Sequence, residues 1–196
     1  MKLTRRRVLG TAAAGAAALS APAAIGAARA KVAVIGGGAG GATAARYLAK
    51  DSQGAIDVTL IEPSRDYYTC FFSNLYIGGF RSLESIRHSY GTLAAEYGIN
   101  VVHDWATGVD AEAREVALAS GSSVPYDRLV VSPGIDFRYE TVPGYDLAAQ
   151  NRMPHSWKAG SQTELLRRQV LAMPEGGTFV MVPPPNPFRC PPGPYE

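Results

Sequence analysis

The sequence predicts an α/β protein of the doubly wound type, with a β-meander inserted after its third strand. Three observations lead to this prediction. A short apolar run at 31–35 leads directly into a glycine-rich turn and then into an alanine-rich stretch that favours a helix. Further apolar runs at 57–61 and 99–102 are typical of the next two strands. Between 105 and 124, apolar residues recur at the spacing of short strands, which indicates the meander.

Residues 1–30 are predicted to be a signal peptide rather than part of the fold. Residues 4–9 read TRRRVL, a twin-arginine signature, and the alanine-dominated stretch that follows ends at 28–30 in an A-x-A cleavage site. The stretch has almost no Leu, Ile or Phe, so a permanent membrane span is not expected. A disordered leader and a membrane helix are the alternatives. We expect export to the periplasm by the twin-arginine route.

The charge balance changes when the leader is set apart. The chain has 19 Lys and Arg against 17 Asp and Glu, but five of the bases and none of the acids lie in the leader. The remainder has 14 bases against 17 acids, a formal charge of −3. We therefore expect no nucleic acid partner. The remaining 166 residues are enough to bury the core of one ordinary domain.

The glycine-rich turn fits a dinucleotide site. Gly36, Gly38 and Gly41 fill the pattern G-x-G-x-x-G, which allows a tight turn, the approach of a pyrophosphate, and close packing of helix on strand. A helix that starts near Ala39 would offer free N–H groups to the phosphates. Glu62 ends the second strand and can accept hydrogen bonds from both ribose hydroxyls. Taken alone, Glu62 would be a solvated strand end, and the glycines do not distinguish NAD from FAD.

The later elements favour FAD. We expect a helix over 82–98, then the third strand and the meander, and then an apolar strand that ends at Ser132-Pro133-Gly134. This order resembles the two-dinucleotide-domain flavoprotein reductases, whose domain is Rossmann-like. In those proteins a glycine turn at this place passes close to FAD. The resemblance therefore implies that Pro133 and Gly134 contribute to FAD binding.

The predicted domains are a signal peptide at 1–30, an FAD-binding domain at 31–148 and the truncated start of a second nucleotide-binding-like domain at 149–196. In the last of these, Ser161 and Glu164 form a capping box that opens a helix, and 178–182 reads as a strand. PPPNPFRCPPGP follows where a second glycine motif would stand. Because prolines lack the N–H groups that bind a pyrophosphate, no NADH site is expected there.

Five stretches carry a more specific resemblance: VTLIEPSRDYYTCFFSN, LESIRHSYG, VVHDWATGVD, PHSWKAGSQTELLRRQ and FRCPPGPYE. Over nearly all of the chain after the leader, they resemble the flavoprotein subunit of flavocytochrome c sulfide dehydrogenase. The resemblance implies that Cys70 is joined to FAD through a thioether at the 8α-methyl carbon. The aromatic residues around Cys70 can wall a flat ligand. An inert cysteine packed as a small hydrophobe is the alternative.

For Cys190 the resemblance implies a redox-active disulfide with a cysteine in the C-terminal half of the family's chain. The resemblance further implies that sulfide attacks that disulfide to leave a persulfide, and that the electrons pass by way of flavin to a c-type cytochrome subunit. Arg189 beside it would favour a thiolate. Cys70 is the only other cysteine here, so we expect this chain to be part of a longer or truncated protein. A structural cysteine and a Cys70–Cys190 disulfide are the alternatives.

Other groups are expected to have ordinary roles. The three histidines, at 88, 103 and 155, lack metal-ligand spacing, so no metal site is predicted. The absence of C-x-x-C-H places any c-type haem in a partner. The alternatives for the whole chain are a sulfide:quinone oxidoreductase-like flavoprotein and a non-catalytic FAD-binding module.

Overall fold

The computed structural model describes residues 28–188 and Cys190. The predicted signal peptide therefore lies outside the described residues except for its last three positions, and Ala30 already belongs to the first strand. Within the described residues, no helix is both long and apolar enough to cross a membrane.

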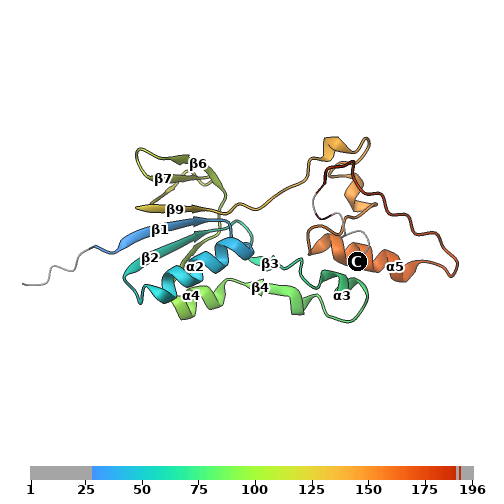
Figure 1. Cartoon of the computed structure of the whole chain (residues 1–196), viewed down its shortest axis with the longest axis horizontal. Helices are drawn as coiled ribbons and strands as arrows, with labels where there is room; N and C mark the ends of the chain where they lie inside the picture. Colours follow the sequence, from blue (N-terminus) through green and yellow to red (C-terminus); the bar gives the residue numbers. More distant parts are fainter. Residues whose placement is uncertain (1–27, 189, 191–196) are drawn as a thin grey trace, which may run out of the picture.

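A four-stranded parallel sheet, with strand order β5-β2-β1-β9, forms the centre of the fold (Figure 1). Its strands are β5 (Asn100–Val102), β2 (Ile56–Ile61), β1 (Ala30–Ile35) and β9 (Arg128–Val131). Helices α2 (Ala39–Asp51) and α4 (Gly91–Tyr97) cover one face of it. The β1–α2–β2 unit and the parallel pairing confirm the predicted α/β fold.

The opposite face of the sheet carries the predicted meander. Strands β6 (Ala106–Asp110), β7 (Glu115–Leu118) and β8 (Ser123–Pro125) form an antiparallel sheet. Successive residues of β1 point to opposite faces, as in any strand. Val34 belongs to the apolar cluster on the face that α2 and α4 cover, and Ala33 belongs to the cluster on the face that the meander covers. Two small cores therefore share one sheet.

The prediction of a helix over 82–98 is wrong for the first half of this range. Residues 84–86 form one 3-10 turn, and β4 (Arg87–Ser89) pairs antiparallel with β3 (Asp66–Tyr68). Tertiary contacts override the local helical pattern: Ile86 is fully buried, and the Arg87 guanidinium donates to the Asp66 carboxylate at 2.8 Å. The remaining helix, α4, ends at Gly98, whose φ is +65°.

The C-terminal part of the described chain contains few regular elements. Two 3-10 turns, η2 (Tyr139–Thr141) and η3 (Ala149–Asn151), precede α5 (Ser161–Ala172), which confirms the predicted helix. α5 lies beside α3 (Ser73–Ile77), away from the sheet (Figure 1).

Two details of the predicted second domain are wrong. Ser161 does not cap α5: the N-cap is Gly160, whose N–H donates to Thr163 Oγ1 at 3.1 Å, because Thr163 is buried there and Ser161 is exposed. Residues 178–182 form no strand, and 179–182 are more than half exposed. No described strand runs beside them to accept their backbone hydrogen bonds, and an isolated strand is not stable.

Candidate functional site: a glycine turn and two exposed cysteines

The glycine turn joins β1 to α2 at the carboxyl edge of the sheet. Gly36 has φ of +94°, a conformation that favours glycine, and a Cβ there would collide with the Ser132 carbonyl. A Cβ on Gly41 would likewise collide with the Gly36 carbonyl. These two glycines are therefore required by close packing between the turn, α2 and the end of β9.

Gly38 has a different environment. It is the N-cap of α2, and a Cβ on it would find only one atom within 4 Å, Cε2 of Tyr67 at 3.8 Å. Packing within the protein thus leaves free space in front of Gly38. The first N–H groups of α2, beginning at Ala39, have no partner within the helix and carry its partial positive charge. A free space beside N–H donors that have no partner within the helix fits a pyrophosphate.

Glu62 follows β2 and reaches under this turn. Its Oε2 accepts the N–H of Gly37 at 2.7 Å, and its Oε1 accepts the N–H of Ser64 at 2.8 Å. Each carboxylate oxygen has a second lone pair, so both can still accept from a ribose hydroxyl. His103 Nδ1 lies 3.1 Å from the Glu62 carbonyl oxygen and donates to it. The predicted acid is thus held in place by backbone and imidazole contacts.

Tyr90 is the main residue of this region that the sequence did not single out. Its ring is 5% exposed, and its hydroxyl donates to the Gly37 carbonyl at 3.0 Å. Burial raises the pKa of the Tyr90 phenol, and the negative charge of Glu62 raises this pKa further. No local pattern could reveal this role, because 82–98 reads as a helix.

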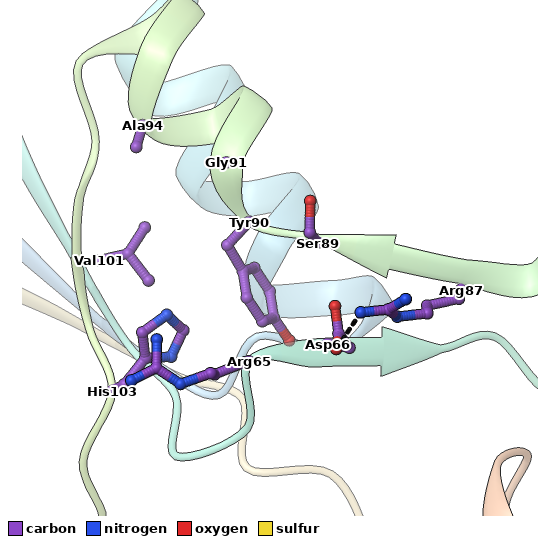
Figure 2. A pocket seen from close by; sticks show the side chains of 9 residues that line it. All are labelled: Arg65, Asp66, Arg87, Ser89, Tyr90, Gly91, Ala94, Val101 and His103. Atoms are coloured by element: carbon purple, nitrogen blue, oxygen red, sulfur yellow. Dashed lines mark hydrogen bonds and ion pairs between the residues drawn. The ribbon is translucent and has the colours of Figure 1, made fainter. Parts of the chain in front are cut away.

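Tyr90 also borders two cavities, of about 350 and 320 Å³. Figure 2 shows the first, where Arg65 and His103 lie on one side of the Tyr90 ring. Val101 and Ala94 contribute apolar surface. This mixture of flat, polar and apolar groups suits a heteroaromatic ring with hydrogen-bonding edges.

β9 brings the predicted glycine turn at 132–134 to the same sheet edge. The Ser132 N–H donates to the Ile35 carbonyl at 2.8 Å, directly beside Gly36. Pro133 and Gly134 follow, and Gly134 has φ of +78° with no atom within 4 Å of a Cβ built on it. The structure therefore places Gly36, Glu62 and this turn together, as parallel strands predict.

Cys70 lies just after β3, is exposed, and forms no disulfide. Cys70 is therefore not packed in the interior as a small hydrophobe. Its carbonyl accepts from the Ser73 N–H at 3.2 Å and from Ser73 Oγ at 2.8 Å. Tyr67 lies three residues earlier, between Cys70 and the glycine turn; burial raises the pKa of its phenol, and the charge of Cys70 adds to this effect.

Cys190 is also exposed and free, so the alternative of a Cys70–Cys190 disulfide is not realised. Its backbone is left-handed, with φ of +54°. Two residues earlier, the Phe188 ring meets the Trp157 ring edge-on, with centroids 6.2 Å apart. Within the described part of the chain, Cys190 and Cys70 are not bonded to each other.

The stretch 155–158 packs against residues that follow the 132–134 turn. The His155 ring stacks against Phe137 with centroids 4.3 Å apart, and Lys158 Nζ lies 2.8 Å from Asp136 Oδ1. The pKa of His155 is lowered to about 4, mainly by burial and also by the positive charge of Lys158, against the opposing effect of Asp136. Within the described residues, no group of three potential metal ligands occurs.

Comparison with known proteins agrees with this geometry. The family model described as "Pyridine nucleotide-disulphide oxidoreductase" matches residues 30–171. A second model, described as "Sulfide dehydrogenase (flavocytochrome c) flavoprotein chain, central", matches 163–196. The sulfide dehydrogenase (flavocytochrome c) flavoprotein chain of Chlorobaculum thiosulfatiphilum is 52% identical over 44 residues, which cover 22% of this chain and 90% of that sequence.

Quinone-linked proteins are also similar. The sulfide-quinone reductase of Aquifex aeolicus is 33% identical over 105 residues, which cover 53% of this chain and 24% of the relative. The mitochondrial sulfide:quinone oxidoreductase of Dictyostelium discoideum is 30% identical over 114 residues, which cover 58% of this chain and 25% of the relative. The chain thus spans about a quarter of the length of these relatives.

Solved structures show the same fold. The sulfide:quinone oxidoreductase of Aquifex aeolicus superposes with a TM-score of 0.60 at 24% identity, covering 72% of this chain and 32% of that one. The structure of an NAD-dependent persulfide reductase from A. fulgidus superposes with a TM-score of 0.59 at 20% identity, covering 72% of this chain and 27% of that one. The match over 30–171 shows that the chain belongs to the pyridine nucleotide-disulphide oxidoreductase family, and the two sulfide dehydrogenase matches show that it is related to the flavoprotein chain of flavocytochrome c sulfide dehydrogenase.

Proposed function

We propose that this chain belongs to an FAD-dependent periplasmic flavoprotein that oxidises sulfide and passes the electrons to a c-type cytochrome subunit. The observation that carries the proposal is the match of residues 163–196, which include Cys190, to the central part of a sulfide dehydrogenase flavoprotein chain. The glycine turn and Glu62 support FAD binding by their geometry. The twin-arginine signature supports export.

The residues at the carboxyl edge of the sheet fit FAD. The N–H groups from Ala39 onward, with the free space in front of Gly38, would hold the pyrophosphate, and the carboxylate of Glu62 would accept from the ribose. Pro133 and Gly134 would border the flavin half. When bound, FAD supplies the acceptor for an electron pair and releases electrons singly to the cytochrome.

Cys70 is proposed as the covalent attachment point. It is an exposed thiol on a loop that follows β3, and that strand carries Tyr67 beside the glycine turn. A thioether between Cys70 Sγ and the 8α-methyl carbon would keep the cofactor in an exported protein. The Ser73 hydroxyl and N–H hold the Cys70 carbonyl, so the backbone that carries this thiol is well defined.

Cys190 is proposed as the sulfur-reactive group, paired with a further cysteine that this sequence does not contain. Hydrosulfide would attack one sulfur of that disulfide; the S–S bond breaks, a persulfide forms on the attacked sulfur, and the other sulfur leaves as a thiolate. Exposure of Cys190 supports access for a small anion.

A sulfide:quinone oxidoreductase-like protein is the second candidate. Similarity to such proteins at 30–33% identity over more than half of the chain favours it. A non-catalytic FAD-binding module is the third. With sulfide as the donor, reduction of cytochrome c by the purified protein would support the first candidate, and reduction of a soluble quinone the second. Retained flavin without either activity would support the third.

The deciding test of the cofactor site is covalent flavin. The full chain is expressed with its own leader and precipitated with acid, and flavin absorbance is measured in the pellet and mapped to tryptic peptides. We expect the flavin on the peptide that contains Cys70. Cys70→Ser should release it to the supernatant, whereas Cys190→Ser should not. Flavin that washes out of the wild-type pellet would contradict attachment at Cys70 and leave non-covalent FAD binding.

A further inference from the structure

Arg167 joins helix α5 to the end of helix α3. Arg167 Nη1 on α5 donates to the carbonyl oxygens of Tyr76 at 2.7 Å and Ile77 at 2.9 Å. These are the last two residues of α3, and α5 follows them by about 90 positions in the chain. Figure 1 shows the two helices side by side.

The contact has the features of a specific site for arginine. The Arg167 side chain is half-buried, and its guanidinium lies 5.4 Å from the centroid of the Tyr76 ring. Gly79 follows α3 with φ of +87°, and a Cβ there would come within 3.1 Å of Arg167 Nη1. The turn after α3 is therefore shaped to admit a planar guanidinium, and a lysine cannot reproduce this geometry.

The other end of α3 carries the Cys70 loop. Ser73 is buried and holds the Cys70 carbonyl through both its N–H and its Oγ. Phe72 between them is left-handed, with φ of +68°, a conformation that costs free energy for a large side chain and persists only when neighbours enforce it. With five residues, α3 is too short to be stable alone, so its contact with α5 must support it.

We propose that Arg167 is a positioning residue for the Cys70 loop: by holding the C-terminal end of α3, it keeps the Ser73 contacts and the Cys70 thiol in one place. The role of this loop in flavin attachment rests on the function proposed above. Arg167 itself would touch neither flavin nor sulfide, and its effect would pass through α3 to Ser73 and Cys70.

The test uses the full chain and compares Arg167→Leu with Arg168→Leu. Arg168 is the adjacent residue on α5, is exposed, and has no side-chain contact among those described, so it is a matched control. The first measurement is amide hydrogen exchange over 70–80 and, as an internal reference, over 30–35 and 56–61. We expect Arg167→Leu to speed exchange over 70–80 by roughly tenfold or more, because two hydrogen bonds to a charged group are lost. Arg168→Leu should leave the exchange over 70–80 unchanged, and neither variant should change the exchange over 30–35 and 56–61.

The second measurement is the fraction of acid-stable flavin, which we expect to fall severalfold in Arg167→Leu and in Arg167→Lys but not in Arg168→Leu. Unchanged exchange over 70–80 in Arg167→Leu would overturn the proposal. Faster exchange over 30–35 and 56–61 as well would show general unfolding and would also overturn it. If the wild type holds no acid-stable flavin but Arg167→Leu loosens 70–80 alone, the positioning of the Cys70 loop stands and the proposed attachment fails.

Discussion

Removing the hydroxyl of Tyr90 should weaken the glycine turn while leaving the packing intact. The substitution Tyr90→Phe keeps the aromatic ring, which is 5% exposed, and deletes only the donor to the Gly37 carbonyl. Gly37 is itself buried. The acceptor would be left without its partner, which costs about 1–3 kcal/mol of folding free energy.

The effect is large enough to measure by urea unfolding followed by far-UV circular dichroism. With a slope of about 2 kcal/mol per molar urea, the midpoint should fall by roughly 0.5–1.5 M without a change in slope. Tyr126→Phe is the control: its hydroxyl lies 3.4 Å from the Asp110 carbonyl in an exposed setting, so its loss should change the stability by less than about 0.5 kcal/mol. Equal midpoints for the two variants would refute the reasoning, since the buried bond would then contribute no more than the exposed one.

Three further predictions concern the glycine turn and the response to pH. Gly41→Ala should lower the free energy of unfolding by about 1–3 kcal/mol, because the added methyl collides with the Gly36 carbonyl. Gly38→Ala should unfold like the wild type but bind FAD roughly tenfold or more weakly, because its methyl projects into the free space that we propose for the pyrophosphate. Equal FAD affinity in a fluorescence titration would contradict the assignment. The pKa of His155 is lowered from 6.5 to about 4, so the unfolded chain binds the proton more readily and stability should decline as pH falls from about 6.5 to 4. His155→Gln should flatten this decline in unfolding midpoints measured across that range, and an unchanged slope would exclude His155 as its source.

The parallel sheet could be predicted because its signals are local. The apolar runs that became β1 and β2, the glycine turn between β1 and α2, and the acid after β2 all lie within about thirty residues. Their spacing follows from the geometry of one β–α–β unit, so a sequence pattern is enough. The same holds for the meander, whose strands alternate and are joined by short turns.

The region between β2 and β5 could not be predicted in the same way. Helix-favouring residues at 82–98 become a 3-10 turn, a strand and a short helix, because β4 pairs with β3 and Tyr90 packs against residues far away in the sequence. The Tyr90 partner, Gly37, lies 53 positions earlier. Periodicity carries no information about such contacts, which explains why Tyr90 was missed although it lies at the centre of the candidate site.

The same distinction separates the two halves of the proposed cofactor site. The pyrophosphate end is built from consecutive elements, and its residues were named correctly as neighbours from the sequence. The Cys70 end depends on α3, a helix of five residues that contacts α5 through Arg167. The sequence divides the chain near residue 148, whereas this contact joins a helix before that boundary to one after it. If the thioether forms at Cys70, its geometry therefore depends on both predicted domains, and a change on α5 should affect flavin attachment without reaching the nucleotide end.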